Sequence, residues 1–287
     1  MAKNAPGFLE VQRSSGLSKI IIYIVVIFFA VLAIYPLFWL VIQSFKTTQE
    51  YLTTSKLAFP HRWFTGNYPY AWRLGNFDVL LLNSIFYSVV TVLAVVFLGF
   101  MAGFAFSKIK TRATPLLHGL FSIGILLTLQ SIMVPLFLMV KAVGLYNTRL
   151  GVLIPYIGLG LPMGVYLGTE FIKSIPDAVI ESARLDGASY LRIFRSIILP
   201  MTAPVAITVG ILTFTGTWNE FMLINILSSD DAIKSIPVGI NSFSGALASD
   251  YGKQFPALVI GLVPMLIFYL IFNKQITKGV VAGAVKG

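Results

Sequence analysis

The feature that most constrains this chain is a series of long apolar stretches almost free of charged side chains. The first runs from residue 20 to 45 and the second from 79 to 107. An α-helix rises 1.5 Å per residue, so about 20 such residues cross the hydrocarbon core of a bilayer. Four more stretches follow, at 113–140, 150–169, 202–225 and 254–273. Residues 20–273 are therefore predicted to form an all-α, polytopic membrane domain with six transmembrane helices.

The composition agrees with a membrane protein. Hydrophobic residues make up 57% of the chain and charged residues only 11%, whereas about 25% of the residues of a soluble chain are charged. The chain has no cysteine, which excludes disulfides and thiolate metal sites. Its formal net charge is +10. In a membrane protein, basic residues mainly set the orientation, so we expect membrane lipid around the chain and no nucleic acid partner.

The basic residues in the short connections predict the orientation. Three of them directly follow the second apolar stretch, namely Lys108, Lys110 and Arg112. With six crossings, they lie on the same side as the N-terminal arm (1–19) and the C-terminal tail (274–287). The connection on the opposite side contains three acidic residues, Asp230, Asp231 and Asp250. Because cytoplasmic loops carry the excess of Lys and Arg, both termini are predicted to be cytoplasmic.

Residues 174–200 form a long, charged, helix-forming segment between two apolar stretches. Ser174 is predicted to cap a first helix, with Pro176 and Asp177 in its first turn. Gly187 can take a positive φ, so this helix is expected to end there. Ser189 is predicted to cap a second helix that reaches residue 200. Amphipathicity alone favours a surface loop packed against the chain's own membrane helices.

The spacing of residues in this segment favours a docking function instead. The pattern reads E-x-A, three residues, G, nine residues and I-x-L-P, formed by Glu181, Ala183, Gly187, Ile197, Leu199 and Pro200. It resembles the cytoplasmic "EAA" loop of ABC importer permeases, with the small Ser182 in place of the middle alanine. The resemblance implies that the loop docks in a cleft of an ATPase subunit and passes its motion to the membrane helices. We expect Asp186 to hydrogen-bond the turn, and Glu181 to meet donors on the ATPase or to pair with Arg184.

The chain lacks the motifs of an enzyme. It has no GxxxxGK[ST] phosphate loop and no HExxH zinc motif, and its two histidines, His61 and His118, stand in unrelated contexts. Apart from Glu170 and Glu220, the apolar stretches contain no carboxylate, whereas ion-coupled carriers usually need charged groups near the midplane. We therefore expect no catalytic residue, no metal site and a pathway-forming subunit driven by another chain.

Four further stretches narrow the resemblance. They are PLFWLVIQSFKT (36–47), GLYNTRLGVLIPY (144–156), FTGTWNEF (214–221) and AGAVKG (282–287). Together they resemble the smaller, six-span permease subunit of maltose-type sugar importers, over essentially the whole chain. The resemblance implies a type I ABC importer permease fold in the inner membrane. It also implies a sister permease, two cytoplasmic ATP-binding subunits that carry ATP and Mg, an extracytoplasmic solute-binding protein, and a sugar or oligosaccharide substrate. No cofactor is expected on this chain itself.

A different class of protein remains as the alternative. A nucleotide-independent channel or carrier for small polar solutes would also have six apolar helices. Such a protein would leave the 174–200 segment without a partner. Co-purification with an ATP-binding chain would separate the two hypotheses.

Two groups of residues are weaker candidates for function. Glu220 is expected near the outer boundary of its span, either as a solvated helix end or as part of a cavity wall. Trp218 is interpreted as an interfacial anchor or a sugar-stacking platform, and Asn219 as a cap or a hydrogen-bonding group between helices. The glycine-rich tail is predicted not to form a stable isolated helix. By resemblance, its Gly283 and Lys286 contact the ATPase subunits.

Overall fold

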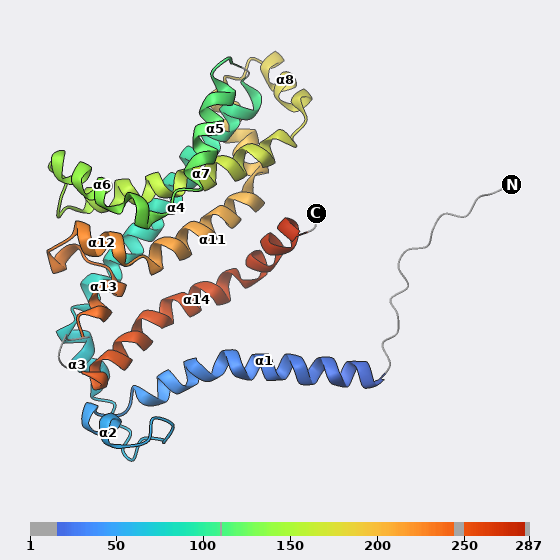
Figure 1. Cartoon of the computed structure of the whole chain (residues 1–287). Helices are drawn as coiled ribbons and strands as arrows, with labels where there is room; N and C mark the ends of the chain where they lie inside the picture. The colour runs from blue at the N-terminus through green and yellow to red at the C-terminus, as the bar shows by residue number, and fades with distance from the viewer. Residues whose placement is uncertain (1–15, 110, 244–249, 285–287) are drawn as a thin grey trace.

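The computed structural model describes residues 16–109, 111–243 and 250–284, and all regular elements within these ranges are helices (Figure 1). Their bounds are α1 Gly16–Gln43, α2 Thr48–Thr53, α3 Asn67–Leu74, α4 Phe77–Lys108, α5 Thr114–Gly124, α6 Leu129–Ala142, α7 Arg149–Lys173, α8 Asp177–Leu185, α9 Tyr190–Ile193, the π-helix η1 Phe194–Ile198, α10 Leu199–Met201, α11 Ala203–Asn219, α12 Met222–Leu227, the 3₁₀-helix η2 Asp231–Ile233, α13 Ile236–Asn241 and α14 Tyr251–Ala284. The predicted all-α class is confirmed. Most of the predicted N-terminal arm (1–15), Lys110 and Lys286 lie outside the described residues.

Among the described residues, four single helices are long and apolar enough to cross a membrane: α1, α4, α7 and α14. Two bent pairs pass the same test together. Helices α5 and α6 meet at 106°, and the Tyr190–Met201 segment meets α11 at 78°. Counting each bent pair as one span gives the predicted number of six, and that count stays a prediction. The breaks inside 113–140 and after Asn219 were not predicted from the sequence.

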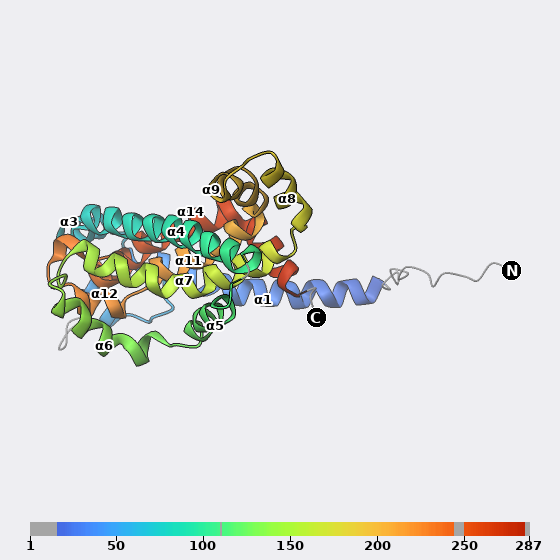
Figure 2. The same ribbon diagram turned by 90° about the horizontal axis from the view of Figure 1, so that it is seen from above.

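The core of the bundle is the crossing of α4 and α7. A Cβ atom on Gly99 of α4 would lie 2.9 Å from the carbonyl carbon of Gly164 on α7. One turn further on, a Cβ atom on Gly103 would lie 2.8 Å from the backbone nitrogen of Thr169. Glycines four residues apart share one helix face, so the two backbones approach directly. Helix α11 packs against the same pair of helices, and α3 and α8 lie near opposite ends of α4 (Figures 1 and 2).

Helix α1 stands apart from this bundle (Figure 1). None of its apolar window is buried within the chain. Near its end it meets the beginning of α14, where the rings of Trp39 and Phe255 lie 5.6 Å apart, edge to face. An apolar surface of this size is stable only against lipid or another apolar chain.

The beginning of α14 is also tied to the beginning of α2. The Thr48 hydroxyl donates to the Asp250 carboxylate at 2.5 Å and accepts from the Gly252 N–H at 2.8 Å. The Lys253 ammonium forms an ion pair with the same carboxylate. Burial of Asp250 favours its neutral form, but the hydrogen bonds from Lys253 and Thr48 outweigh this effect and lower its pKa. The connection between α1 and α3 is thereby attached to the membrane domain.

The close backbone approach of α4 and α7 generates a stability prediction. Gly103→Ala is expected to push the backbone of α7 away and to lower the free energy of unfolding by about 1–3 kcal/mol, because overpacked side chains strain their surroundings. Gly158→Ala on α7 is the matched control, since its new Cβ would meet nothing within 4 Å. Alanine there should leave stability unchanged or raise it by about 0.5–1 kcal/mol through helix propensity. Thermal unfolding in detergent compares the two variants, and equal midpoints would contradict the packing argument.

Candidate functional site

The first helix of the 174–200 segment begins two residues later than predicted. Helix α7 continues to Lys173, and the Ser174 hydroxyl donates back to the Phe171 carbonyl at 2.6 Å. Helix α8 starts at Asp177, with Pro176 in an extended conformation at its N-cap position. The prediction that Ser174 caps this helix is therefore wrong. A serine at the end of a helix can satisfy a free carbonyl of the preceding turn as readily as it caps the next helix.

The predicted bend at Gly187 is confirmed. Its φ is +79°, in the left-handed region. The Gly187 N–H donates to the Arg184 carbonyl at 3.0 Å, and the Ala188 N–H donates to the Ala183 carbonyl at 2.9 Å. These two bonds form a complete Schellman motif, which ends α8 at a defined angle. Ser189 caps α9 as predicted, because its hydroxyl accepts from the Arg192 N–H at 3.3 Å.

The carboxylates of this loop do not make the contacts that we expected. Within the described part of the chain, neither Asp186 nor Glu181 makes a side-chain hydrogen bond or ion pair. The predicted bond of Asp186 to the turn and the predicted pair of Glu181 with Arg184 are therefore wrong, and a contact of Glu181 with the ATPase stays a prediction. The Schellman bonds already use the two donors that Asp186 would need. Arg184 lies over the ring of Tyr190 at 4.6 Å and donates to the Ala188 carbonyl at 3.3 Å, which turns it away from Glu181.

The middle of the second half of the loop, Phe194–Ile198, is wound as a π-helix rather than an α-helix. Helix η1 follows α9 directly, and the Leu199 N–H donates to the Phe194 carbonyl five residues before it. Pro200 has no N–H, and its ring clashes with a carbonyl four residues earlier, so a regular α-helix cannot pass unchanged. Single π-turns of this kind are frequent at functional sites. Ile197 and Leu199 are partly buried, and both pack against the core.

One face of the 174–200 loop packs against the membrane helices, and the opposite face is exposed. Its buried side chains join residues of α4, α7 and α11 in one apolar cluster; they are Ile175, Ile180, Ala183, Ile193, Phe194 and Ile198. On the opposite face, Glu181, Ser182, Asp186 and Gly187 are exposed. Leu185 is 89% exposed at the tip of α8. An exposed leucine beside two carboxylates without partners among the described residues, on a firmly packed segment, is a surface suited to contact another protein.

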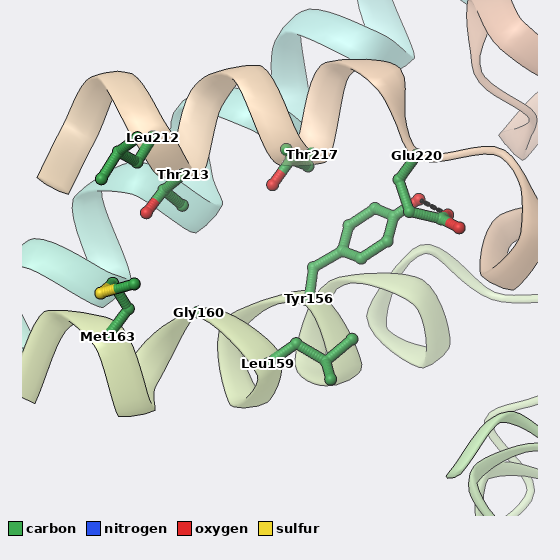
Figure 3. Close-up of a pocket in the computed structure, with 9 residues that line it drawn as sticks. Tyr156, Leu159, Gly160, Met163, Leu212, Thr213, Thr217 and Glu220 are labelled. Carbon is green, nitrogen blue, oxygen red and sulfur yellow. Dashed lines mark hydrogen bonds between the residues drawn. The ribbon is translucent and has the colours of Figure 1, made fainter. Parts of the chain in front are cut away.

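A pocket of about 310 Å³ lies between α7 and α11 (Figure 3). It is lined by Tyr156, Leu159, Gly160, Met163, Leu212, Thr213, Gly216, Thr217 and Glu220. The hydroxyls of Thr213 and Thr217 point from α11 toward α7. The pocket thus combines an apolar wall with a few polar groups, as in sites for small molecules.

Glu220 lies in the wall of this pocket, at the break between α11 and α12. One carboxylate oxygen accepts from the Tyr156 hydroxyl at 2.7 Å and from the Ile224 N–H at 3.1 Å. The other accepts from the Leu223 N–H at 2.7 Å. The carboxylate therefore caps the N-terminus of α12, where the helix dipole favours a negative charge. Tyr156, which the sequence analysis missed, gives no local signal, because its partner is 64 residues away.

The neighbours of Glu220 lie outside the pocket. Trp218 is only 3% exposed and stacks on Phe214 at 5.6 Å, within an apolar cluster that includes Phe77. It is therefore not available as a sugar-stacking surface in this conformation. Asn219 is exposed, and its side chain donates to the Thr215 carbonyl at 2.9 Å, one turn back in the same helix.

The C-terminal tail, predicted to begin at residue 274, is helical as far as residue 284. Helix α14 continues through the predicted boundary at residue 273 to Ala284, so Gly283 lies in a helix. A sequence that cannot nucleate a helix alone can extend one that is already formed, because propagation is much easier than nucleation. Within the described residues, no group of three His, Asp or Glu side chains could hold a metal ion.

Comparison with known proteins identifies the family. Residues 95–276 match the family described as binding-protein-dependent transport system inner membrane component. The chain belongs to this family. It is a multi-pass membrane component of a transport system, and not a catalytic domain.

Several relatives are similar over most of their length. The permease protein NgcG of the diacetylchitobiose uptake system of Streptomyces coelicolor is 32% identical over 90% of this chain and 85% of its own. The trehalose transport permease SugB of Mycobacterium tuberculosis is also 32% identical, over 89% of this chain and 93% of its own. The multiple sugar-binding transport permease MsmG of Streptococcus mutans is 33% identical, over 92% and 96%.

A solved structure supports the fold. A chain of a bacterial ABC transporter involved in the import of the acidic polysaccharide alginate superposes with a TM-score of 0.79. The match covers 93% of this chain and 99% of the other, at 22% sequence identity. The chain therefore has the fold of an ABC importer permease, as predicted.

The hydrogen bond between Tyr156 and Glu220 generates a second prediction. Tyr156→Phe removes the donor and is expected to lower the free energy of unfolding by about 1.5–3 kcal/mol, as is typical for a hydrogen bond to a charged group. Tyr166→Phe, also on α7 but 40% exposed, is the control and should change little. Thermal unfolding of the purified protein compares them. If both variants unfold like the wild type, Tyr156 does not stabilise the α11–α12 break.

Proposed function

We propose that this chain is a permease subunit of a binding-protein-dependent ABC importer for sugars or oligosaccharides. It forms half of the translocation pathway and couples ATP hydrolysis by partner subunits to uptake. The observation that carries this proposal is the 174–200 loop, packed on one face and exposed on the other, at the spacing of the importer docking loop. The sugar class is supported by relatives whose names refer to diacetylchitobiose, trehalose and multiple sugars.

The proposal includes an orientation and a set of partners. The basic residues Lys108, Lys110 and Arg112 support a cytoplasmic location of the loop and of both termini, because cytoplasmic connections carry the excess of Lys and Arg. The partners are a sister permease, two cytoplasmic ATP-binding subunits that hold ATP and Mg, and an extracytoplasmic solute-binding protein. The uncovered apolar surface of α1 supports a sister subunit beside it in the membrane. By the same resemblance, Gly283 and Lys286 of the C-terminal tail contact the ATP-binding subunits.

The proposed mechanism is alternating access. ATP binding closes the ATPase dimer, the docked loop moves, and the cavity between the permeases turns outward to receive the sugar. The pocket between α7 and α11 is a section of that pathway, because its threonine hydroxyls and Glu220 offer hydrogen bonds to a hydroxyl-rich solute. Of the three residues predicted for the pathway, Glu220 lines this pocket, whereas Trp218 is buried in the apolar cluster with Phe77 and Asn219 is exposed on α11. A nucleotide-independent channel, the alternative, is disfavoured because it gives the exposed loop nothing to bind.

The bend in the loop provides the test. A side chain at Gly187 would meet nothing within 4 Å, so only its φ of +79° opposes a substitution. Gly187→Val is therefore expected to lower the free energy of unfolding by about 1–2 kcal/mol. This loss is too small to unfold the domain but enough to change the direction of α9. Glu181→Lys reverses an exposed charge on the same face. Both variants should insert and assemble with the sister subunit, yet retain less ATPase subunit and lose hydrolysis stimulated by sugar-loaded binding protein.

The measurements are the amount of ATPase subunit that co-purifies and the rate of stimulated hydrolysis. Gly119→Val, at an open position in α5, is the control for the glycine substitution and should behave like the wild type. If Gly187→Val and Glu181→Lys both keep normal retention and normal hydrolysis, the loop is not the coupling element.

A further inference from the structure

The last residue of α4, Lys108, is attached to the first residues of the 174–200 loop, which we call the coupling loop. The Lys108 side chain is only 6% exposed, and its ammonium group donates to the Ile175 carbonyl and to the Asp177 carboxylate, both at 2.6 Å. Ile175 lies between α7 and α8, and Asp177 is the first residue of α8. A buried ammonium group is costly unless its donors are satisfied, so the position of Lys108 depends on these acceptors.

Aromatic packing strengthens the attachment. The ring of Phe104, one turn before Lys108, lies 6.3 Å from Tyr190 and 6.0 Å from Phe194. Phe97 lies 5.8 Å from Phe194, edge to face. Both halves of the coupling loop therefore rest on α4.

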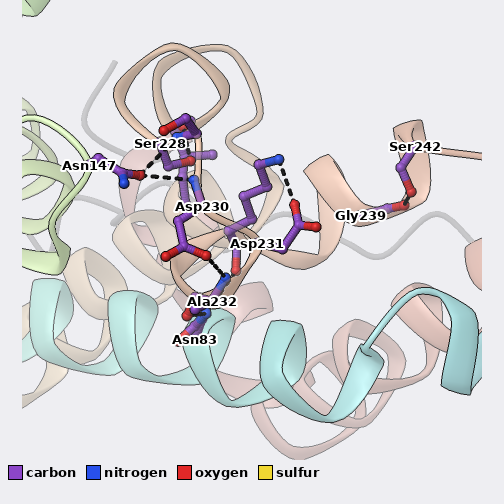
Figure 4. Close-up of polar contacts among 11 residues, drawn as sticks. Asn83, Asn147, Ser228, Asp230, Asp231, Ala232, Gly239 and Ser242 are labelled. Carbon is purple, nitrogen blue, oxygen red and sulfur yellow. Dashed lines mark hydrogen bonds and ion pairs between the residues drawn. The ribbon is translucent and has the colours of Figure 1, made fainter.

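The other end of α4 is tied to a second segment, residues 228–242. The Asn83 amide donates to the carbonyls of Ala232 and Lys234 at 2.9 and 3.0 Å (Figure 4). The Tyr87 hydroxyl donates to the Ile233 carbonyl at 2.8 Å. The Ser84 hydroxyl accepts from the Ile236 N–H at 2.9 Å. Three side chains of α4 thus bind the backbone of one short segment.

Between these two ends, α4 is continuous. It has 32 residues, or about 48 Å at 1.5 Å per residue. Among the described long helices, α1, α7 and α14 each contain an internal proline, whereas α4 contains none. Prolines are the commonest cause of kinks, so α4 is built to move as one rigid body.

We propose that α4 is a rigid strut that links the coupling loop to the 228–242 segment on the opposite side of the membrane, and that Lys108 is its positioning residue at the cytoplasmic end. The inference rests on the proposed function, because it takes the loop for the element that docks on the ATPase. Motion of α8 is passed through Lys108 to α4, and through Asn83, Ser84 and Tyr87 to the segment that faces the binding protein.

Amide hydrogen exchange in the complete transporter tests the strut without requiring the sugar. In the wild type, ATP with vanadate should change the exchange rates of residues 228–242. Lys108→Met keeps the apolar stem but removes the donors, and should reduce this change by about 2- to 30-fold while ATPase subunits stay bound. Lys108→Arg keeps a donor and should restore most of the change. Lys173→Met, which removes an exposed ion pair with Glu170, should have no effect.

Tyr87→Phe provides an independent variant, because it removes one outer hydrogen bond and leaves the coupling loop intact. It should also reduce the exchange response, without changing ATPase retention. Two results would contradict the role of α4 but not the proposed function. One is a wild type that binds ATPase subunits but shows no exchange response, and the other is a full exchange response in both Lys108→Met and Tyr87→Phe. A wild type that retains no ATP-binding subunit would overturn the proposed function.

Discussion

The direct backbone contact between α4 and α7 is the constraint on which the rest of the structure depends. In a bilayer, apolar side chains gain little by leaving lipid for one another, so helix association relies on close packing. Gly99 and Gly103 on one helix and Gly164 on the other provide that closeness. The pair then forms the frame for everything else. Helix α11 packs on it to make the pocket, the coupling loop rests on one end of α4, and the 228–242 segment is bound at the other.

The shape of the coupling loop is set by its backbone hydrogen bonds and by its buried apolar face. The Schellman bonds at Gly187 and the π-turn before Pro200 satisfy the chain internally, and an apolar face anchors it to the bundle. The charged side chains of Glu181 and Asp186 are left free for a partner. This arrangement is useful for coupling, because carboxylates that do not stabilise the loop itself are available to bind a partner.

Glu220 shows how a carboxylate can be tolerated within an apolar domain. Its oxygens accept from two backbone N–H groups of α12 and from the Tyr156 hydroxyl. The break after α11 creates these donors, since the first N–H groups of any helix lack partners. The backbone of Glu220 ends α11, and its carboxylate caps α12 and gives the pocket between α7 and α11 a charged wall.

The sequence by itself determined the all-α membrane class, the apolar stretches, the bend at Gly187 and the cap at Ser189, because hydropathy and backbone preferences are local properties. Only the tertiary structure decided that Ser174 closes α7, that the 113–140 stretch is bent, that Trp218 is buried and that α14 runs on to Ala284. It also decided that Lys108 meets Ile175 and Asp177 and that Glu220 meets Tyr156, which are partners 64 to 69 residues away along the chain. Hydropathy predicts which side chains are removed from water. Which distant residues these side chains contact depends on how the helices cross.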